Sequence, residues 1–178
     1  MHDDEPLDLI GALIRYGTVD SVDLAARKCT VKIGDIVTQP VRWLHGAAGG
    51  TGGSSIWLPV TVGEQGILLA PEGDVSGAIF VPGVDSTANP AAGNSARALI
   101  RFADGAVIAY DPENHVLDVT LPAGGTANIV AETLTLTGDL HVTGTITADT
   151  DVIGGGKSLK THKHGGVQAG AAQTGVPA

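Results

Sequence analysis

Two histidines near the carboxyl end, His162 and His164, have the type and spacing that suit metal binding. In an extended segment, side chains two positions apart point to the same side, so both imidazoles can face one axis. One chain offers two ligands, whereas three copies around that axis would supply six nitrogen atoms. Six neutral imidazoles make an octahedral site, which suits Fe(II), Ni(II) or Co(II) better than zinc, whose protein sites are mostly tetrahedral. The alternative is a pair of exposed histidines in a flexible tail.

Motifs of common enzymes are incomplete in this sequence. The Gly-Lys-Ser segment at 156–158 imitates the end of a phosphate-binding P-loop, but the glycine required five positions earlier is replaced by Asp151. No Gly-x-Ser-x-Gly motif exists, and Cys29 has no histidine nearby, so we expect it to be a buried strand residue. Asp149 and Asp151 share an outer face, where solvated charge is expected. We therefore predict no enzyme activity, and a glycan-cleaving enzyme is the remaining alternative.

The stretch 134–152, which leads to the histidine pair, alternates strictly between apolar or small residues and Thr, Asp or His. A β-strand sends successive side chains to opposite faces, so one face is expected to be apolar. Gly138 and Gly144 recur on the apolar parity, which indicates short rungs and corners instead of one long strand. Other copies of the chain are the obvious cover for this face. We predict an intertwined β-helix, although an edge strand of a β-sandwich fits the alternation too.

The composition favours short strands over a large globular core. The 178 residues include 26 Gly but only two each of Phe, Tyr and Trp. No apolar run reaches the length of a membrane helix, and the acidic start Met-His-Asp-Asp-Glu has the wrong charge for a signal peptide. We expect a protein made in the cytoplasm without a signal peptide.

Charge is distributed unevenly along the chain, whose net charge is −9. Residues 102–156 contain eight acids and no Lys or Arg, whereas the last 27 residues contain Lys157, Lys160 and Lys163 and no acid. This acidic stretch argues against nucleic-acid binding, because binding requires basic surface to neutralise phosphates. The basic end could meet an anionic bacterial surface, or its lysines could only keep the tip solvated.

The first half of the chain predicts a short helix followed by a small closed barrel. Residues 5–16 have an apolar stripe at helical spacing, with Pro6 suited to the first turn. Strand-like segments with intervening turns follow at 17–24, 28–33, 36–44, 56–58, 66–70 and 77–81. Such short strands fit an OB-fold. The glycine-rich segment 45–55 lacks the ending of a phosphate-binding loop, so a flexible loop is favoured.

The second half begins with a linker at 85–97, which is rich in Ser, Asn and Ala. A hairpin is predicted at 98–110, with its turn at Asp104-Gly105, and a further strand at 116–121.

Three parts of the sequence resemble a known family. They are Trp43, the segment 57–74 (WLPVTVGEQGILLAPEGD), and the tail 158–170 (SLKTHKHGGVQAG) with 173–177 (QTGVP) after it. In this order and spacing they resemble the baseplate assembly protein V family, the central spikes of contractile phage tails, and the equivalent spikes of R-type pyocins. The resemblance covers the whole chain.

This resemblance implies an all-β homotrimer. Its parts would be an N-terminal attachment segment at 1–17, an OB-fold domain at 18–84, the linker at 85–97, a triple-stranded β-helix shaft at 98–156 and an apex at 157–178. The apex would hold one iron ion per trimer, with six ligands from His162 and His164 of each chain. Calcium or chloride ions inside the shaft are also known in relatives, but no ligands for them can be assigned.

The implied function is mechanical. The spike would close the end of the tail tube in the virion baseplate or a phage-tail-like particle, and sheath contraction would drive it through the outer membrane of a Gram-negative cell. The N-terminal parts would attach it to the tail tube and baseplate hub, without binding nucleic acid. The alternative is a trimeric fibre-tip module that recognises lipopolysaccharide.

Overall fold

The computed structural model describes residues 11, 13–166 and 170. Its contacts divide the chain into two units, residues 1–127 and 128–178. In the described residues most regular elements are β-strands. The helical residues are Gly11, Leu13 and two short 3-10 helices, η1 (Pro71–Gly73) and η2 (Val75–Gly77). None of the described helices is both long and apolar enough to cross a membrane. The predicted all-β class is confirmed.

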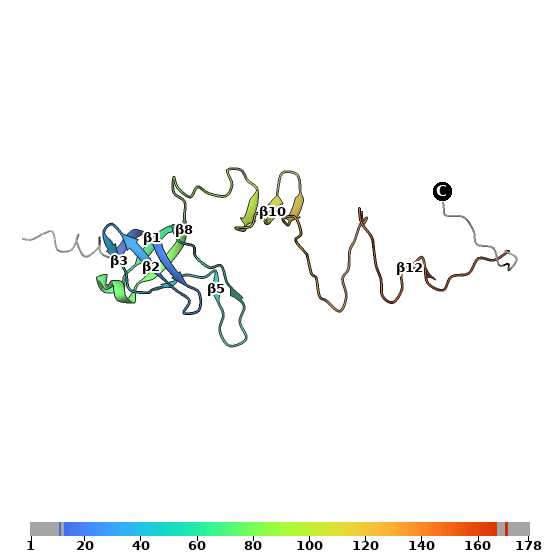
Figure 1. Ribbon diagram of the computed structural model, residues 1–178, viewed down its shortest axis with the longest axis horizontal. Helices are drawn as coiled ribbons and strands as arrows, with labels where there is room; N and C mark the ends of the chain where they lie inside the picture. Colours follow the sequence, from blue (N-terminus) through green and yellow to red (C-terminus); the bar gives the residue numbers. More distant parts are fainter. Residues whose placement is uncertain (1–10, 12, 167–169, 171–178) are drawn as a thin grey trace, which may run out of the picture. The chain divides into compact units, whose positions relative to one another are not determined.

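The first unit contains a six-stranded sheet in the order β3-β2-β1-β7-β8-β4 (Figure 1). Its strands are β1 (Ile14–Asp23), β2 (Lys28–Ile33), β3 (Ile36–Val37), β4 (Arg42–Trp43), β7 (Gln65–Leu69) and β8 (Ile79–Val84). All neighbours are antiparallel except β4 and β8. An isolated bridge between Cys29 and Val41 joins β2 to the residue before β4, so the sheet closes on itself as a barrel.

Side chains from alternate strand positions fill this barrel. Phe80 and Val31 are 0% exposed, and Leu68 is 1% exposed. Gly66 lies against this core, where an added Cβ would collide with the Val81 carbonyl oxygen and the Phe80 ring. The core cluster consists of Val19, Cys29, Val31, Val41, Trp43, Val60, Leu68, Ala70, Ala78 and Phe80. The predicted OB-type barrel is therefore built around one small core.

Two expectations for this unit need correction at their edges. The helix predicted over 5–16 is wrong for Ile14–Tyr16, because these residues begin β1, where Ile14 pairs with Leu69 and Tyr16 with Ile67. Gly11 and Leu13 are helical, and the rest of the predicted helix lies outside the described residues. The single strand predicted over 36–44 is divided into β3 and β4, with Pro40 between them.

The glycine-rich segment 45–55 is not a free loop throughout. Strand β5 (Ala47–Ala48) pairs with β6 (Ser55–Ile56), which closes a small hairpin. Gly49 and Gly52 both have φ of 73°, a conformation that favours glycine, so the composition serves the turn.

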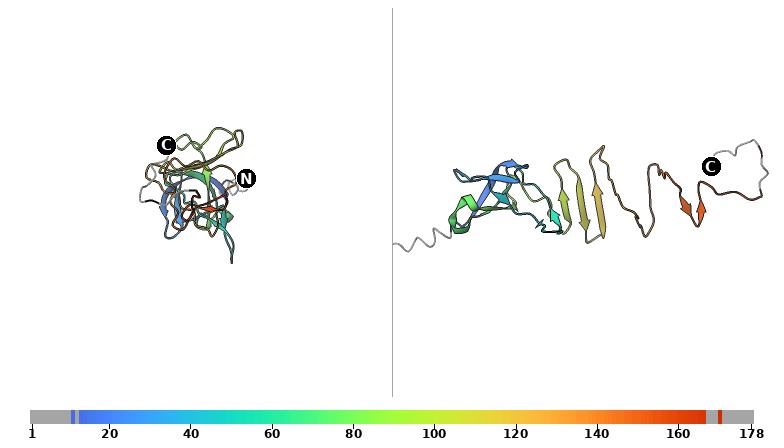
Figure 2. Two further views of the ribbon diagram at one scale, coloured as in Figure 1. Left: turned by 90° about the vertical axis from the view of Figure 1, so that its right-hand side faces the viewer. Right: turned by 90° about the horizontal axis from the view of Figure 1, so that it is seen from below.

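A three-stranded sheet follows in the order β11-β10-β9, and Figure 2 shows its strands side by side. Strands β9 (Ala98–Arg101) and β10 (Val107–Asp111) form the predicted hairpin, and β11 (Val116–Thr120) is the predicted strand. At the turn, the Ala106 amide donates to Asp104 Oδ1 at 3.0 Å. The preceding residues 85–97, which were predicted to be a linker, contain no strand.

The alternating stretch in the second unit has no regular strand between Thr120 and Ile153. Both parities are exposed, including Leu136 at 62% and Leu140 at 67%. The strands expected here are therefore absent from the single chain, and no strand in the described part of this unit pairs with the stretch. Bends occur at residues 132, 138, 143–144 and 149–150, so consecutive bends lie six residues apart. The glycines predicted to mark corners, Gly138 and Gly144, are two of these bends.

Candidate metal centre at the apex

A short hairpin positions the histidine pair. Strand β12 (Ile153–Gly154) pairs with β13 (Lys157–Ser158) across a two-residue turn. The turn residues Gly155 and Gly156 have φ of 55° and 77°, and positive φ at both central positions matches the twist of antiparallel strands. The chain thus reverses direction at Gly155-Gly156, six residues before His162.

Asp151 ties the two sides of this hairpin together. Its Oδ1 atom accepts hydrogen bonds from the amides of Val152 at 2.8 Å and Lys160 at 3.1 Å. The Leu159 amide donates to the Val152 carbonyl at 2.8 Å. The Ser158 hydroxyl and the amides of Lys160, Val152 and Leu159 lower the pKa of Asp151, because they stabilise its ionised form. The carboxylate acts as a structural acceptor.

The backbone of the hairpin also orients the first histidine. The Nδ1 atom of His162 lies 3.1 Å from the Ser158 carbonyl oxygen and 3.0 Å from that of Leu159. Carbonyl oxygens only accept hydrogen bonds, so these contacts require the hydrogen of a neutral ring to be on Nδ1. The lone pair is then on Nε2, which is the free nitrogen that a metal ion needs.

The structure brings His162 and His164 together, as the spacing predicted. Their ring centroids lie 5.0 Å apart with an angle of 79° between the rings. Among the described residues, no group of three or more His, Cys, Asp or Glu is placed to bind a metal. A single chain therefore provides a pair of imidazoles, and neutral imidazoles are suitable ligands for a first-row transition metal.

Sequence reasoning found the two histidines but missed the groups that hold them. Asp151 was expected to be solvated charge, whereas it bonds the backbone of the hairpin. The glycine pair before Lys157 was the available signal, since two adjacent glycines between extended segments indicate a tight hairpin.

The other candidate sites do not assemble in the structure. Cys29 is 2% exposed, and burial, with a smaller contribution from Glu64, raises the pKa of its thiol to about 11. A thiol with this pKa stays protonated and unreactive at neutral pH. The Gly-Lys-Ser segment at 156–158 enters β13 and not a helix. His45 packs against Trp43 and Trp57 instead of joining the pair.

The comparisons with known proteins agree with these features. Residues 15–84 match the type VI secretion system and phage-baseplate injector OB domain, and residues 158–178 match the GpV Apex motif. The second match contains both histidines. The chain is also similar to the spike protein of Escherichia phage P2, with 35% identity over 93% of this chain and 92% of that protein. This level of identity over nearly the full length of both proteins shows that the chain belongs to the family of phage baseplate spike proteins.

Proposed function

We propose that the protein is a membrane-piercing spike that works as a homotrimer with a metal ion at its tip. The observation that carries this proposal is the exposure of the stretch 134–152, where the largely apolar even-numbered side chains are exposed. Alternating residues without a partner strand need another chain to bury the apolar side. Three intertwined copies would provide it and form the triple-stranded β-helix that the family resemblance implies.

The apex supports the metal part of the proposal. Each chain presents His162 with Nε2 free and His164 beside it. Three copies would hold one ion with six imidazoles, for which iron is our choice. When bound, the ion would crosslink three chain ends. We assign no ligands for calcium or chloride in the shaft.

Membership of a family of phage baseplate spike proteins supports a position in the virion tail. The proposed trimer with a metal ion at its tip supports a mechanical role. We propose that the barrel and the residues before it attach to the tail tube and baseplate hub. Contraction of the sheath would then push the apex through the outer membrane of a Gram-negative cell. A rigid tip needs no catalytic turnover, so the proposed role is not enzymatic.

The test measures molar mass by light scattering and metal content by elemental analysis on the same full-length sample. The expected result is a trimer with one iron ion per three chains. The double variant His162→Ala/His164→Ala should lose the metal and keep the trimer. His141→Ala is the matched control, since His141 lies in the exposed shaft segment and should not affect the metal.

Two outcomes would contradict the proposal. A monomer at micromolar concentration would exclude the intertwined shaft, and unchanged iron in the double variant would exclude the site. Piercing is separated from lipopolysaccharide recognition by vesicle leakage. Metal-dependent leakage without glycan preference supports piercing, whereas binding that saturates with defined glycans supports recognition.

A further inference from the structure

The barrel is weakly closed where β2 approaches β4. Cys29 and Val41 exchange backbone hydrogen bonds of 2.9 and 2.8 Å at this seam. One residue beyond the bridge lie Lys28 on β2 and Arg42 on β4, and no further ladder between these strands is present in the described part of the chain. The closure is therefore open on the side of these two basic residues.

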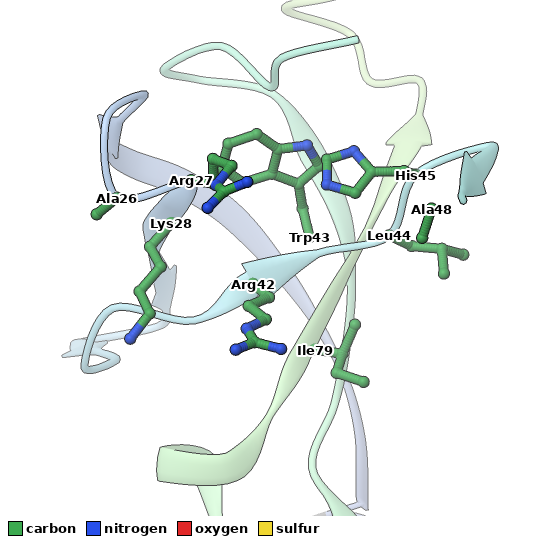
Figure 3. Close-up of a pocket in the computed structure, with 9 residues that line it drawn as sticks. All are labelled: Ala26, Arg27, Lys28, Arg42, Trp43, Leu44, His45, Ala48 and Ile79. Atoms are coloured by element: carbon green, nitrogen blue, oxygen red, sulfur yellow. The ribbon is translucent and has the colours of Figure 1, made fainter. Parts of the chain in front are cut away.

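Two adjoining pockets occupy this opening and share Lys28, Arg42 and Ile79 in their linings. The larger has a volume of about 490 Å³ and is also lined by Arg27, Trp43 and Leu44 (Figure 3). We call the two together the seam groove. Figure 3 shows Arg42 and Trp43, adjacent on β4, extending to opposite sides of the strand. The groove thus follows the strand edge instead of forming one closed cavity.

The groove has an unusual charge for this protein. Three of the ten Lys and Arg residues line it, and none of its lining residues is acidic, although the net charge of the chain is −9. Among the described residues, Arg27, Lys28 and Arg42 take part in no ion pair. The salt bridge present in the described residues joins Arg97 and Asp118, which do not line the groove. Like charges close together repel one another, so an anionic ligand would be stabilised here.

The remaining lining residues indicate what else the ligand must contain. Leu44 is 57% exposed and Ile79 is 42% exposed, which gives the groove an apolar rim beside its cations. Trp43 is 3% exposed, and its Nε1 atom is buried without a hydrogen-bond partner in the described residues. A ligand that carries carboxylates and apolar groups fits both the basic side chains and the apolar rim of the groove.

A protein segment fits better than a nucleic acid. OB-folds bind single strands by stacking bases on exposed aromatic rings. In the seam groove Trp43 belongs to the buried core, so its ring is not open for stacking. The other ring in the lining, the half-buried His45, packs against Trp43 and Trp57. Cations beside exposed aliphatic side chains instead match an acidic peptide that contains apolar residues.

We propose that the seam groove binds an extended acidic segment of a partner protein in the baseplate. Its carboxylates would pair with Arg27, Lys28 and Arg42, and its apolar side chains would pack on Leu44 and Ile79. The inference depends on the barrel alone, so it does not require the metal or the shaft.

The test uses the full-length protein and a fluorescein-labelled peptide of alternating Glu and Leu residues. Fluorescence anisotropy should show saturable binding that weakens as salt rises, because salt screens the charges. Arg42→Ala should weaken binding by about tenfold or more, since it removes a charge-assisted pair. Lys32→Ala is the matched control, because Lys32 is exposed on β2 but does not line the groove. Arg27→Gly is a second test variant, since Arg27 has φ of 55°, which glycine adopts easily.

Several results would overturn the proposal. These include an absence of binding, equal losses in Arg42→Ala and Lys32→Ala, and tighter binding of oligothymidylate than of the peptide. A change of molar mass in Arg42→Ala would assign the groove to a contact between copies. If replacing Asp3, Asp4 and Glu5 together by Asn, Asn and Gln makes the peptide bind more tightly, the groove is assigned to the acidic start of the chain.

Discussion

The barrel and the segment 134–152, which we call the shaft segment, have the same alternating sequence pattern, but its apolar side chains are buried in the barrel and exposed in the shaft segment. In β2, alternate residues Cys29 and Val31 are buried, because β1, β3 and the bridge at Val41 surround them within the same chain. In the segment 128–152 the alternate residues Leu136 and Leu140 are exposed. Alternation therefore determines which side chains share a face, while the chain's other strands determine whether that face is covered.

The largest predicted effect tests whether copies cover the shaft. Leu136→Asp with Leu140→Asp should abolish the proposed trimer, because buried unpaired carboxylates are strongly unfavourable. Light scattering should then give the mass of one chain. Thr137→Asp, on the opposite parity, is the matched control and should remain a trimer. If the double leucine variant stays a trimer as the Thr137→Asp control does, the leucines face solvent in the assembly as well.

The next effect concerns the barrel. Phe80→Ala should lower its free energy of unfolding by about 3–5 kcal/mol, because it leaves a cavity in a core where Phe80 is 0% exposed. Urea denaturation followed by tryptophan fluorescence measures this, since Trp43 and Trp57 both lie in this unit. Phe102→Ala, at a residue that is 42% exposed, should cost clearly less. Equal costs would show that the barrel core is not the main source of stability.

This contrast also explains which features the sequence could predict. Strand β2 agrees with the predicted range 28–33, and the hairpin at 98–110 was expected from Asp104-Gly105, because their pairing partners are close in the sequence. The prediction for the start of β1 was wrong. Ile14 and its neighbours have apolar residues at helical spacing, but their pairing with β7, where Ile14 pairs with Leu69, makes them a strand. This partner is distant in the sequence, and local spacing does not reveal it.

The apex shows the same division. The spacing of His162 and His164 was sufficient to predict that they lie together, because it needs only an extended segment. The acceptors for the His162 ring are carbonyl oxygens of Ser158 and Leu159. Backbone groups carry no signature of their own in a sequence, so these contacts could not be predicted from residue types.

The rate of thiol labelling compares the burial of one residue in the barrel, Cys29, with that of one residue in the shaft segment, Leu140. Cys29 should react with a thiol reagent at neutral pH only when the barrel opens, since the pKa of its buried thiol is about 11. In a Cys29→Ala background, Leu140→Cys should be protected in the proposed trimer and should react rapidly after dissociation. Rapid labelling of Leu140→Cys in an intact trimer would contradict the buried shaft.

The smallest expected effect is local to the apex hairpin. The folded pKa of Asp151 is lowered, so its stabilising contribution is present above the ordinary value of about 3.9 and is lost as pH falls through the lower folded value. NMR should show a constant Lys160 amide shift from neutral pH to about pH 5, and a change in more acidic solution. Asp151→Ala should shift this amide at every pH. Asp149→Ala is the control, and an equal shift in it would exclude the specific hydrogen bond.

The spacing of the bends in the shaft segment has a consequence for how such proteins evolve. Bends at residues 132, 138, 144 and 150 divide the segment into units of six residues, an even number. Duplicating or deleting one unit therefore leaves every later side chain on its original face, whereas an insertion of odd length would reverse them all. Small genetic steps can thus lengthen or shorten this segment without changing which face the later side chains share.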